Sequence, residues 1–193
     1  MHGRIGDFLA ARFRPDGTLD GSWAQSGRIV GLFNASIGSA RAVDVDTEGR
    51  AVLAGHVDHQ FAAVRLTVDG QLDATFGAQH DGRFRQDLVG NNWNEATALA
   101  RQADGCYVIG GWANTVPGSS SDFAAVRLKA DGTLDTAFGN AGIVFTPMAG
   151  GTRNDQSHGL VMQPDDRVPT VRAIQAGEAN GSNHDFAVQR LWL

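Results

Sequence analysis

Three residues near the carboxyl end of the chain have the side-chain types of a serine hydrolase. Asp155, Ser157 and His158 could supply the orienting carboxylate, the nucleophilic hydroxyl and the general base. Neighbouring residues of a strand point to opposite faces, so Ser157 and His158 would not readily hydrogen-bond to each other there. The chain also has no Gly-x-Ser-x-Gly sequence, which would form a nucleophile elbow. These residues are the candidate catalytic set of our second hypothesis, a hydrolase of small carboxylic esters.

A second group of residues could bind a ligand rather than transform it. It combines amide and aromatic side chains, at Asn92, Trp93, Asn94 and, further along the chain, Trp112. Aromatic faces and amide hydrogen bonds together suit sugars or the edges of peptides. Our first hypothesis is therefore a binding or scaffold module for a small ligand or a protein partner.

Two segments have part of a metal site, and neither completes one. Residues 44–49 resemble the start of a calcium loop, but Gly55 stands where the loop requires a bidentate glutamate. His56, Asp58 and His59 have the alternate spacing of metal ligands, although an exposed loop between repeats explains them more simply. The chain has a single cysteine, which leaves neither an internal disulfide nor a cysteine-rich zinc site. We predict no metal and no cofactor.

Composition and charge restrict the classes of partner. The 193 residues are 42% hydrophobic and 19% charged, with a net charge of −5 at pH 7. A negative chain is poorly suited to nucleic acid phosphates or to electrostatic attachment to a membrane. The first residues lack the apolar segment of a signal peptide, and the compartment stays open. We therefore predict neither a nucleic acid nor a membrane as partner.

One pattern of residues recurs along the whole chain. Each copy begins with a Phe-x-x-x-Arg-(Leu/Phe) run, continues through Asp-Gly-x-Leu-Asp and reaches an aromatic residue. The copies start at Phe8, Phe61, Phe123 and Phe186. A second pattern lies between them, in which a turn such as Gln102-Ala103-Asp104-Gly105 leads into an apolar run. Such self-similarity indicates a repeat architecture.

The repeat predicts an all-β chain built from propeller-type blades. Each copy has about four short strand candidates, two of which flank an Asp-Gly-type turn, and none has helical spacing. Four antiparallel strands per repeat match a propeller blade better than a β-solenoid. We expect a single repeat domain over residues 1–193, with repeats at about 7–58, 59–121 and 122–184 and a terminal strand at 185–193.

Taken together, these motifs resemble the delta-sixty repeat family of bacterial proteins. The resemblance rests on Asp-Phe at the strand start, Arg-Leu at its end, Asp-Gly-x-Leu-Asp-x-x-Phe-Gly, and Gln-x-Asp-Gly before an apolar strand. It covers nearly the whole chain and implies propeller blades. It implies no catalytic residue.

The recurring residues also predict how the blades are joined. Phe61, Ala63 and Arg65 should share one face of their strand, and small alanines should let neighbouring blades approach closely. Each repeated arginine should pair with the aspartate of its own turn, as Arg65 with Asp73. Three blades are too few to close a ring. We therefore expect a homodimer that closes a six-bladed ring, the alternative being a piece of a longer propeller.

Departures from the repeat are where we look for function. The third copy departs most, because Ser157 and His158 replace the small and polar residues of the second copy. If a hydrolase site exists, we expect it in the channel or at the junction of the dimer. A purely structural fragment is the third hypothesis.

Overall fold

The computed structural model describes residues 6–90, 93–116, 120–148, 154–163, 172–180 and 184–193. These residues form an all-β structure, as the repeats predicted. Its strands are β1 (Leu9–Ala11), β2 (Arg28–Val30), β3 (Gly38–Val45), β4 (Ala51–Val57), β5 (Gln60–Leu66), β6 (Arg83–Gln86), β7 (Asn94–Arg101), β8 (Tyr107–Val116), β9 (Ser120–Leu128), β10 (Ile143–Thr146), β11 (Asp155–Gln163), β12 (Arg172–Asn180) and β13 (His184–Trp192).

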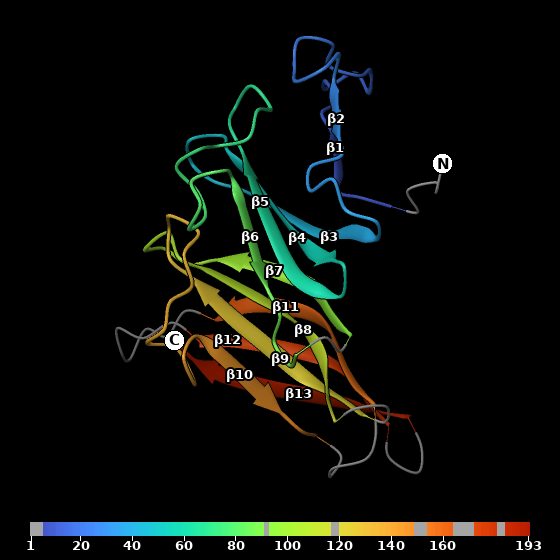
Figure 1. Cartoon of the computed structure of the whole chain (residues 1–193), viewed down its shortest axis with the longest axis vertical. Helices are drawn as coiled ribbons and strands as arrows, with labels where there is room; N and C mark the ends of the chain where they lie inside the picture. Colours follow the sequence, from blue (N-terminus) through green and yellow to red (C-terminus); the bar gives the residue numbers. More distant parts are fainter. Residues whose placement is uncertain (1–5, 91–92, 117–119, 149–153, 164–171, 181–183) are drawn as a thin grey trace.

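The strands form four antiparallel sheets that follow one another along the chain. Sheet 1 is β1–β2, sheet 2 is β3–β4–β5–β6, sheet 3 is β7–β8–β9–β10, and sheet 4 is β11–β12–β13. Within each sheet, strands adjacent in sequence are adjacent in space, as in a propeller blade. Figure 1 shows sheet 1 at one end of the long axis, sheet 2 next to it, and sheets 3 and 4 overlapping in this view toward the other end. The architecture is therefore a row of propeller-type blades.

The sheets are out of phase with the sequence repeats. The phenylalanine that starts each copy lies at or just before the third strand of a four-stranded blade, at β5 for Phe61 and β9 for Phe123. The second repeat, for example, contains the last two strands of sheet 2 (β5 and β6) and the first two strands of sheet 3 (β7 and β8). The boundary between the first and second repeats falls within sheet 2, in the tight turn between β4 and β5 formed by Asp58 and His59.

The hydrophobic core is divided among the joints between sheets. Ala62, Val64 and Leu66 of β5 belong to the cluster shared with sheet 1. Phe61 and Ala63, from the opposite face of the same strand, belong to the cluster shared with sheet 3. All five are fully buried. The alternation predicted for this strand therefore serves two neighbours, which is why both of its faces are apolar.

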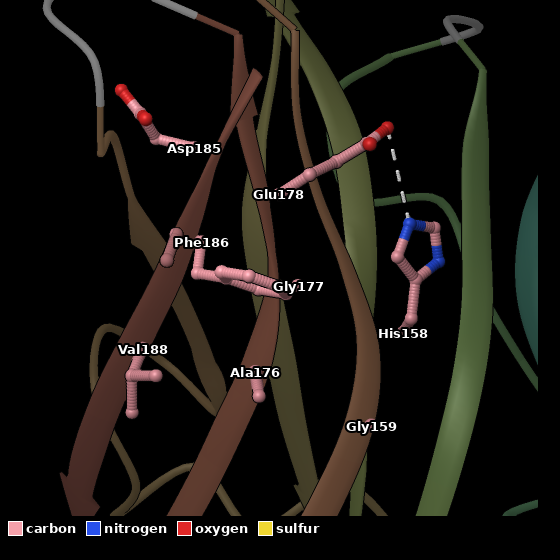
Figure 2. Close-up of a pocket in the computed structure, with 9 residues that line it drawn as sticks. His158, Gly159, Ala176, Gly177, Glu178, Asp185, Phe186 and Val188 are labelled. Carbon is pink, nitrogen blue, oxygen red and sulfur yellow. Dashed lines mark ion pairs between the residues drawn. The ribbon is translucent and has the colours of Figure 1, made fainter.

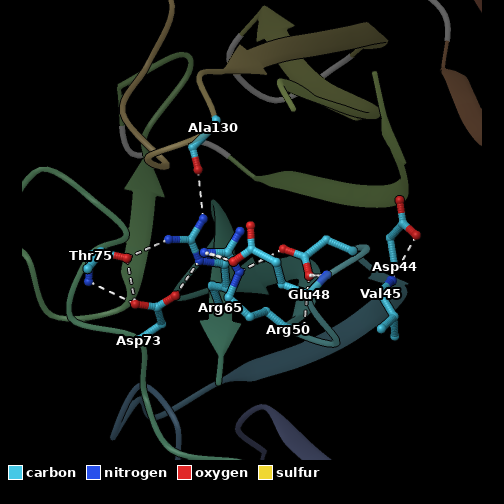
Figure 3. Close-up of polar contacts among 9 residues, drawn as sticks. Asp44, Val45, Glu48, Arg50, Arg65, Asp73, Thr75 and Ala130 are labelled. Carbon is cyan, nitrogen blue, oxygen red and sulfur yellow. Dashed lines mark hydrogen bonds and ion pairs between the residues drawn. The ribbon is translucent and has the colours of Figure 1, made fainter. Parts of the chain in front are cut away.

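The repeated arginines join each sheet to the next one. Arg65 Nε donates to Asp73 Oδ2 at 2.7 Å, and Arg65 Nη1 donates to the carbonyl of Ala130 in the following repeat, also at 2.7 Å (Figure 3). Arg12 makes the corresponding bonds to Asp20 at 2.9 Å and to the carbonyl of Val68 at 2.9 Å. The predicted pairing is confirmed, and the same side chain also bridges two sheets.

The glycines of the Asp-Gly turns are required by both conformation and space. Gly70 and Gly132 have φ of 76° and 77°, a region that favours glycine. A Cβ on Gly70 would lie 2.6 Å from the ring of Trp23, and one on Gly132 would lie 2.5 Å from the ring of Phe76. The aromatic residue of one repeat therefore packs directly on the turn of the next.

Candidate functional site

A polar hollow of about 390 Å³ lies where sheets 3 and 4 meet. It opens near the end of β8 and the starts of β9 and β11. We call it the tryptophan pocket; its lining residues are Trp93, Trp112, Asn114, Ser120, Ser121, Asn154 and Gln156. All seven side chains are uncharged. The pocket therefore suits a neutral ligand that offers hydrogen-bonding groups and an apolar face.

Trp93 is held in place from sheet 2. Its ring lies 4.0 Å from the ring of His59, centroid to centroid, while 40% of the residue stays exposed. The next residue, Asn94, is fully buried and donates its backbone N–H and its Nδ2 to the carbonyl of His59, at 3.0 and 2.9 Å. His59 and its neighbour Asp58 both have positive φ, as in a two-residue hairpin turn. This turn therefore positions the indole.

Trp112 and Ser121 come from the central strands of sheet 3. Trp112 lies on β8 opposite Phe123 of β9, close to the end of the hairpin. Ser121 is fully buried, and its backbone N–H donates to Asn154 Oδ1 at 3.3 Å. The Ser121 Oγ is buried without a hydrogen-bond partner among the described residues. An unsatisfied buried hydroxyl costs free energy, so this atom is a local weak point of the sheet 3–sheet 4 contact.

Charged groups lie beside the pocket, on its sheet 2 side. Arg41 Nε donates to Glu95 Oε1 at 2.8 Å, and His56 Nδ1 lies 3.8 Å from the same oxygen. Burial lowers the pKa of His56, and this outweighs the opposite effect of the Glu95 charge. Burial thus favours the neutral form of the His56 imidazole, and Arg41 is the cation that pairs with Glu95.

Two of the four predicted ligand-binding residues, Trp93 and Trp112, line the pocket together. Asn94 does not line it; its side chain is buried and holds the His59 turn. Asn92 lies outside the described residues. The sequence did not point to Ser121, Asn154 or the other lining residues. Asn154 reaches the pocket only because sheet 4 packs on sheet 3, and nothing local in the sequence indicates that contact.

The candidate catalytic residues lie on β11 but do not form a hydrogen-bonded relay. Ser157 is fully buried, and its Oγ accepts from Gln175 Nε2 at 3.2 Å. Asp155 Oδ2 accepts the backbone N–H of Met148 at 2.7 Å. The His158 side chain is exposed, with Nε2 3.9 Å from Glu178 Oε1 (Figure 2). Ser157 is thus buried and His158 exposed, at an irregularity in the β11–β12 pairing.

The calcium-like segment is an ordinary turn in the structure. Asp46 Oδ1 accepts the backbone N–H groups of Glu48 and Arg50, both at 2.9 Å, and its Oδ2 accepts Arg50 Nε at 2.8 Å. Within the part of the chain that the structure describes, no three His, Cys, Asp or Glu side chains gather in a way that could hold a metal ion. Asp46 therefore closes the turn with protein partners.

Comparison with known proteins supports the fold. Residues 102–138 match a family model described as "Domain of unknown function (DUF5122) beta-propeller". The matched segment covers β8, β9 and the Arg127–Asp135 turn, which is the part of the repeat that forms a joint. No curated protein matches the chain. Across the described residues, no helix has the length and apolar character needed to cross a membrane. The chain is thus similar to a β-propeller repeat family.

Proposed function

We propose that this chain is a propeller-type binding module, with the tryptophan pocket as its site and a small uncharged polyhydroxylated molecule, such as a sugar, as its ligand. The observation that carries the proposal is the meeting of Trp93 and Trp112 with uncharged amide and hydroxyl side chains around one hollow. An indole face packs well on the C–H face of a sugar ring. Amide and serine groups can both donate and accept hydrogen bonds to hydroxyls.

The size of the pocket supports a small ligand. Ligand pockets typically have volumes of about 300–1,000 Å³, and the tryptophan pocket has about 390 Å³. This volume accommodates one or two sugar rings better than a folded protein loop. The absence of charge from the described lining also disfavours phosphorylated or carboxylated ligands, because their charge would lose hydration without gaining a counter-ion.

Titration of intrinsic tryptophan fluorescence with a panel of neutral mono- and disaccharides tests the proposal. A binding sugar should change the fluorescence and raise the melting temperature, since a ligand at roughly 100 times its Kd stabilises the folded state by about 2.7 kcal/mol. Trp112→Ala should abolish both effects. Val68→Ala is the control, because Val68 is exposed and does not line the pocket. Equal responses of the two variants would contradict the site, and no response to any sugar would contradict the ligand class.

The hydrolase remains the alternative prediction. Its candidate nucleophile, Ser157, is fully buried and would need a base, whereas the His158 imidazole is exposed with Nε2 3.9 Å from Glu178 Oε1. Turnover of a chromogenic short-chain ester, lost in both Ser157→Ala and His158→Ala, would support this alternative. Ligand-induced stabilisation without turnover supports the binding module instead.

A further inference from the structure

The repeat has one phenylalanine that is not buried. Phe8, Phe61 and Phe123 occupy the same position in successive copies, and all three have no exposed surface. Phe186 occupies that position in β13 and is 101% exposed. Phe61 and Ala63 pack toward the following sheet, so the equivalent side chains of β13 lie on the face of sheet 4 that no described sheet covers.

The exposed face of sheet 4 is apolar and hollowed. A depression of about 630 Å³ extends over β11, β12 and β13; Phe186 and Val188 are among its apolar lining residues, and His158, Glu178 and Asp185 are its titratable ones (Figure 2). Val188 and Trp192, which share this face with Phe186, are also exposed. An apolar surface of this kind indicates an interaction site. We call it the tail face.

Sheet 1 exposes the complementary surface at the other end of the chain. Leu9 and Phe13, each 63% exposed, occupy the positions of Ala62 and Leu66, which the preceding sheet buries completely. Val30 of β2 is exposed as well. We call this surface the head face.

The first Asp-Gly turn shows independently that the head face is uncovered. Gly17 has the same positive φ as Gly70 and Gly132, at 82°. A Cβ on Gly17 would meet nothing within 4 Å, whereas the other two would meet an aromatic ring of the preceding repeat. The turn of the first repeat thus has the same conformation as the turns of the second and third, but the space that an aromatic ring fills in those is open here.

We propose that the tail face of one copy packs on the head face of a second copy, and so repeats the joint already present between sheets 2 and 3. Each chain contains both halves of this joint. The two faces lie at opposite ends of the molecule, so neither can cover the other within one chain and both are exposed (Figure 1). A second copy is therefore the partner for which the chain itself provides a matching surface, through a head-to-tail contact.

Two single substitutions on exposed positions test the contact. Phe186→Asp removes the tail face and Leu9→Asp removes the head face, and light scattering measures the mass of each particle. The wild-type chain should have at least twice the monomer mass of 20.4 kDa, and each variant alone should be monomeric. An equimolar mixture of the two should regain a dimer, because the intact head face of one fits the intact tail face of the other.

The mixture distinguishes the proposal from its competitors. Val68→Asp, at an exposed turn residue outside both faces, is the control and should associate as the wild type does. If Leu9→Asp alone still forms dimers while Phe186→Asp does not, the contact is tail-to-tail and the proposal is wrong. A monomeric wild-type chain at every concentration, or a mixture that stays monomeric, also overturns it. Circular dichroism shows that each variant retains its sheets.

Discussion

Arg65→Met should cost far more stability than the same substitution at Arg12, although the two arginines are copies of one position. Arg65 is 3% exposed and donates to Asp73, Thr75 and the carbonyl of Ala130, at 2.7, 2.8 and 2.7 Å. Its guanidinium also lies 4.8 Å from the centroid of the Phe76 ring. Methionine keeps most of the apolar stem but leaves the Asp73 carboxylate buried without its cation.

The expected magnitude follows from burial. Breaking a buried ion pair by removing one partner costs about 3–5 kcal/mol. The side chain of Arg12 is 42% exposed, and exposed pairs contribute about 0–1 kcal/mol. We therefore expect the free energy of unfolding to fall by at least about 2 kcal/mol more in Arg65→Met than in Arg12→Met.

Urea denaturation followed by tryptophan fluorescence at pH 7 measures both changes. Adding Asp73→Asn to Arg65→Met should cost less than the same change in the wild-type chain, because the orphaned charge is then removed. Equal losses for Arg65→Met and Arg12→Met would refute the reasoning, since they would mean that the joint between sheets 2 and 3 does not depend on the buried pair.

Three further outcomes follow from the turns and from the site. Burial raises the pKa of Asp73, but the hydrogen bonds from Thr75 and Arg65 together lower it by more than burial raises it, so the pKa lies below the usual 3.8. The ionised Asp73 carboxylate should contribute its full stabilisation above the unfolded pKa of about 3.9, and this stabilisation should be lost as the pH falls through the lower pKa of the folded state. The melting temperature of Asp73→Asn should therefore fall less steeply with acid pH than that of the wild-type chain. Gly132→Ala should lower the melting temperature more than Gly17→Ala, because both carry the positive φ but only Gly132 would also collide with Phe76; equal shifts would contradict the packing argument. Ser121→Ala should keep or raise the melting temperature of the free protein, because the buried Ser121 hydroxyl has no described partner to lose; a lower melting temperature would contradict this.

The sequence predicted the Arg–Asp pairs because both residues of each pair lie close together in one copy of the repeat. Arg65 and Asp73 are eight positions apart, and the same pair recurs in three copies of the repeat, where its regular spacing marks the two residues as partners. The positive φ at Gly70 and Gly132 was likewise predictable from the Asp-Gly turns. The bridge from Arg65 to Ala130 was not, because it depends on how two sheets stack.

The candidate site was only partly predictable, for the same reason. Trp93 and Trp112 could be singled out as aromatic residues in polar surroundings, but Asn154 joins them through the packing of sheet 4 on sheet 3. Ser157 is fully buried and the His158 side chain is 57% exposed, at a point where the β11–β12 pairing is irregular. The sequence could not show that Gln175, from the next strand, would occupy the Ser157 hydroxyl.

The phase difference between repeats and sheets has a consequence for how the chain unfolds. Because a repeat such as 59–121 ends one sheet and begins another, its loss would remove two strands from each of two neighbouring sheets. A row of self-contained blades could lose its members one at a time, with only the contacts between blades resisting. Here the backbone hydrogen bonds of the sheets themselves tie consecutive copies together. Unfolding of one repeat should therefore destabilise its neighbours, and local opening should extend beyond one repeat.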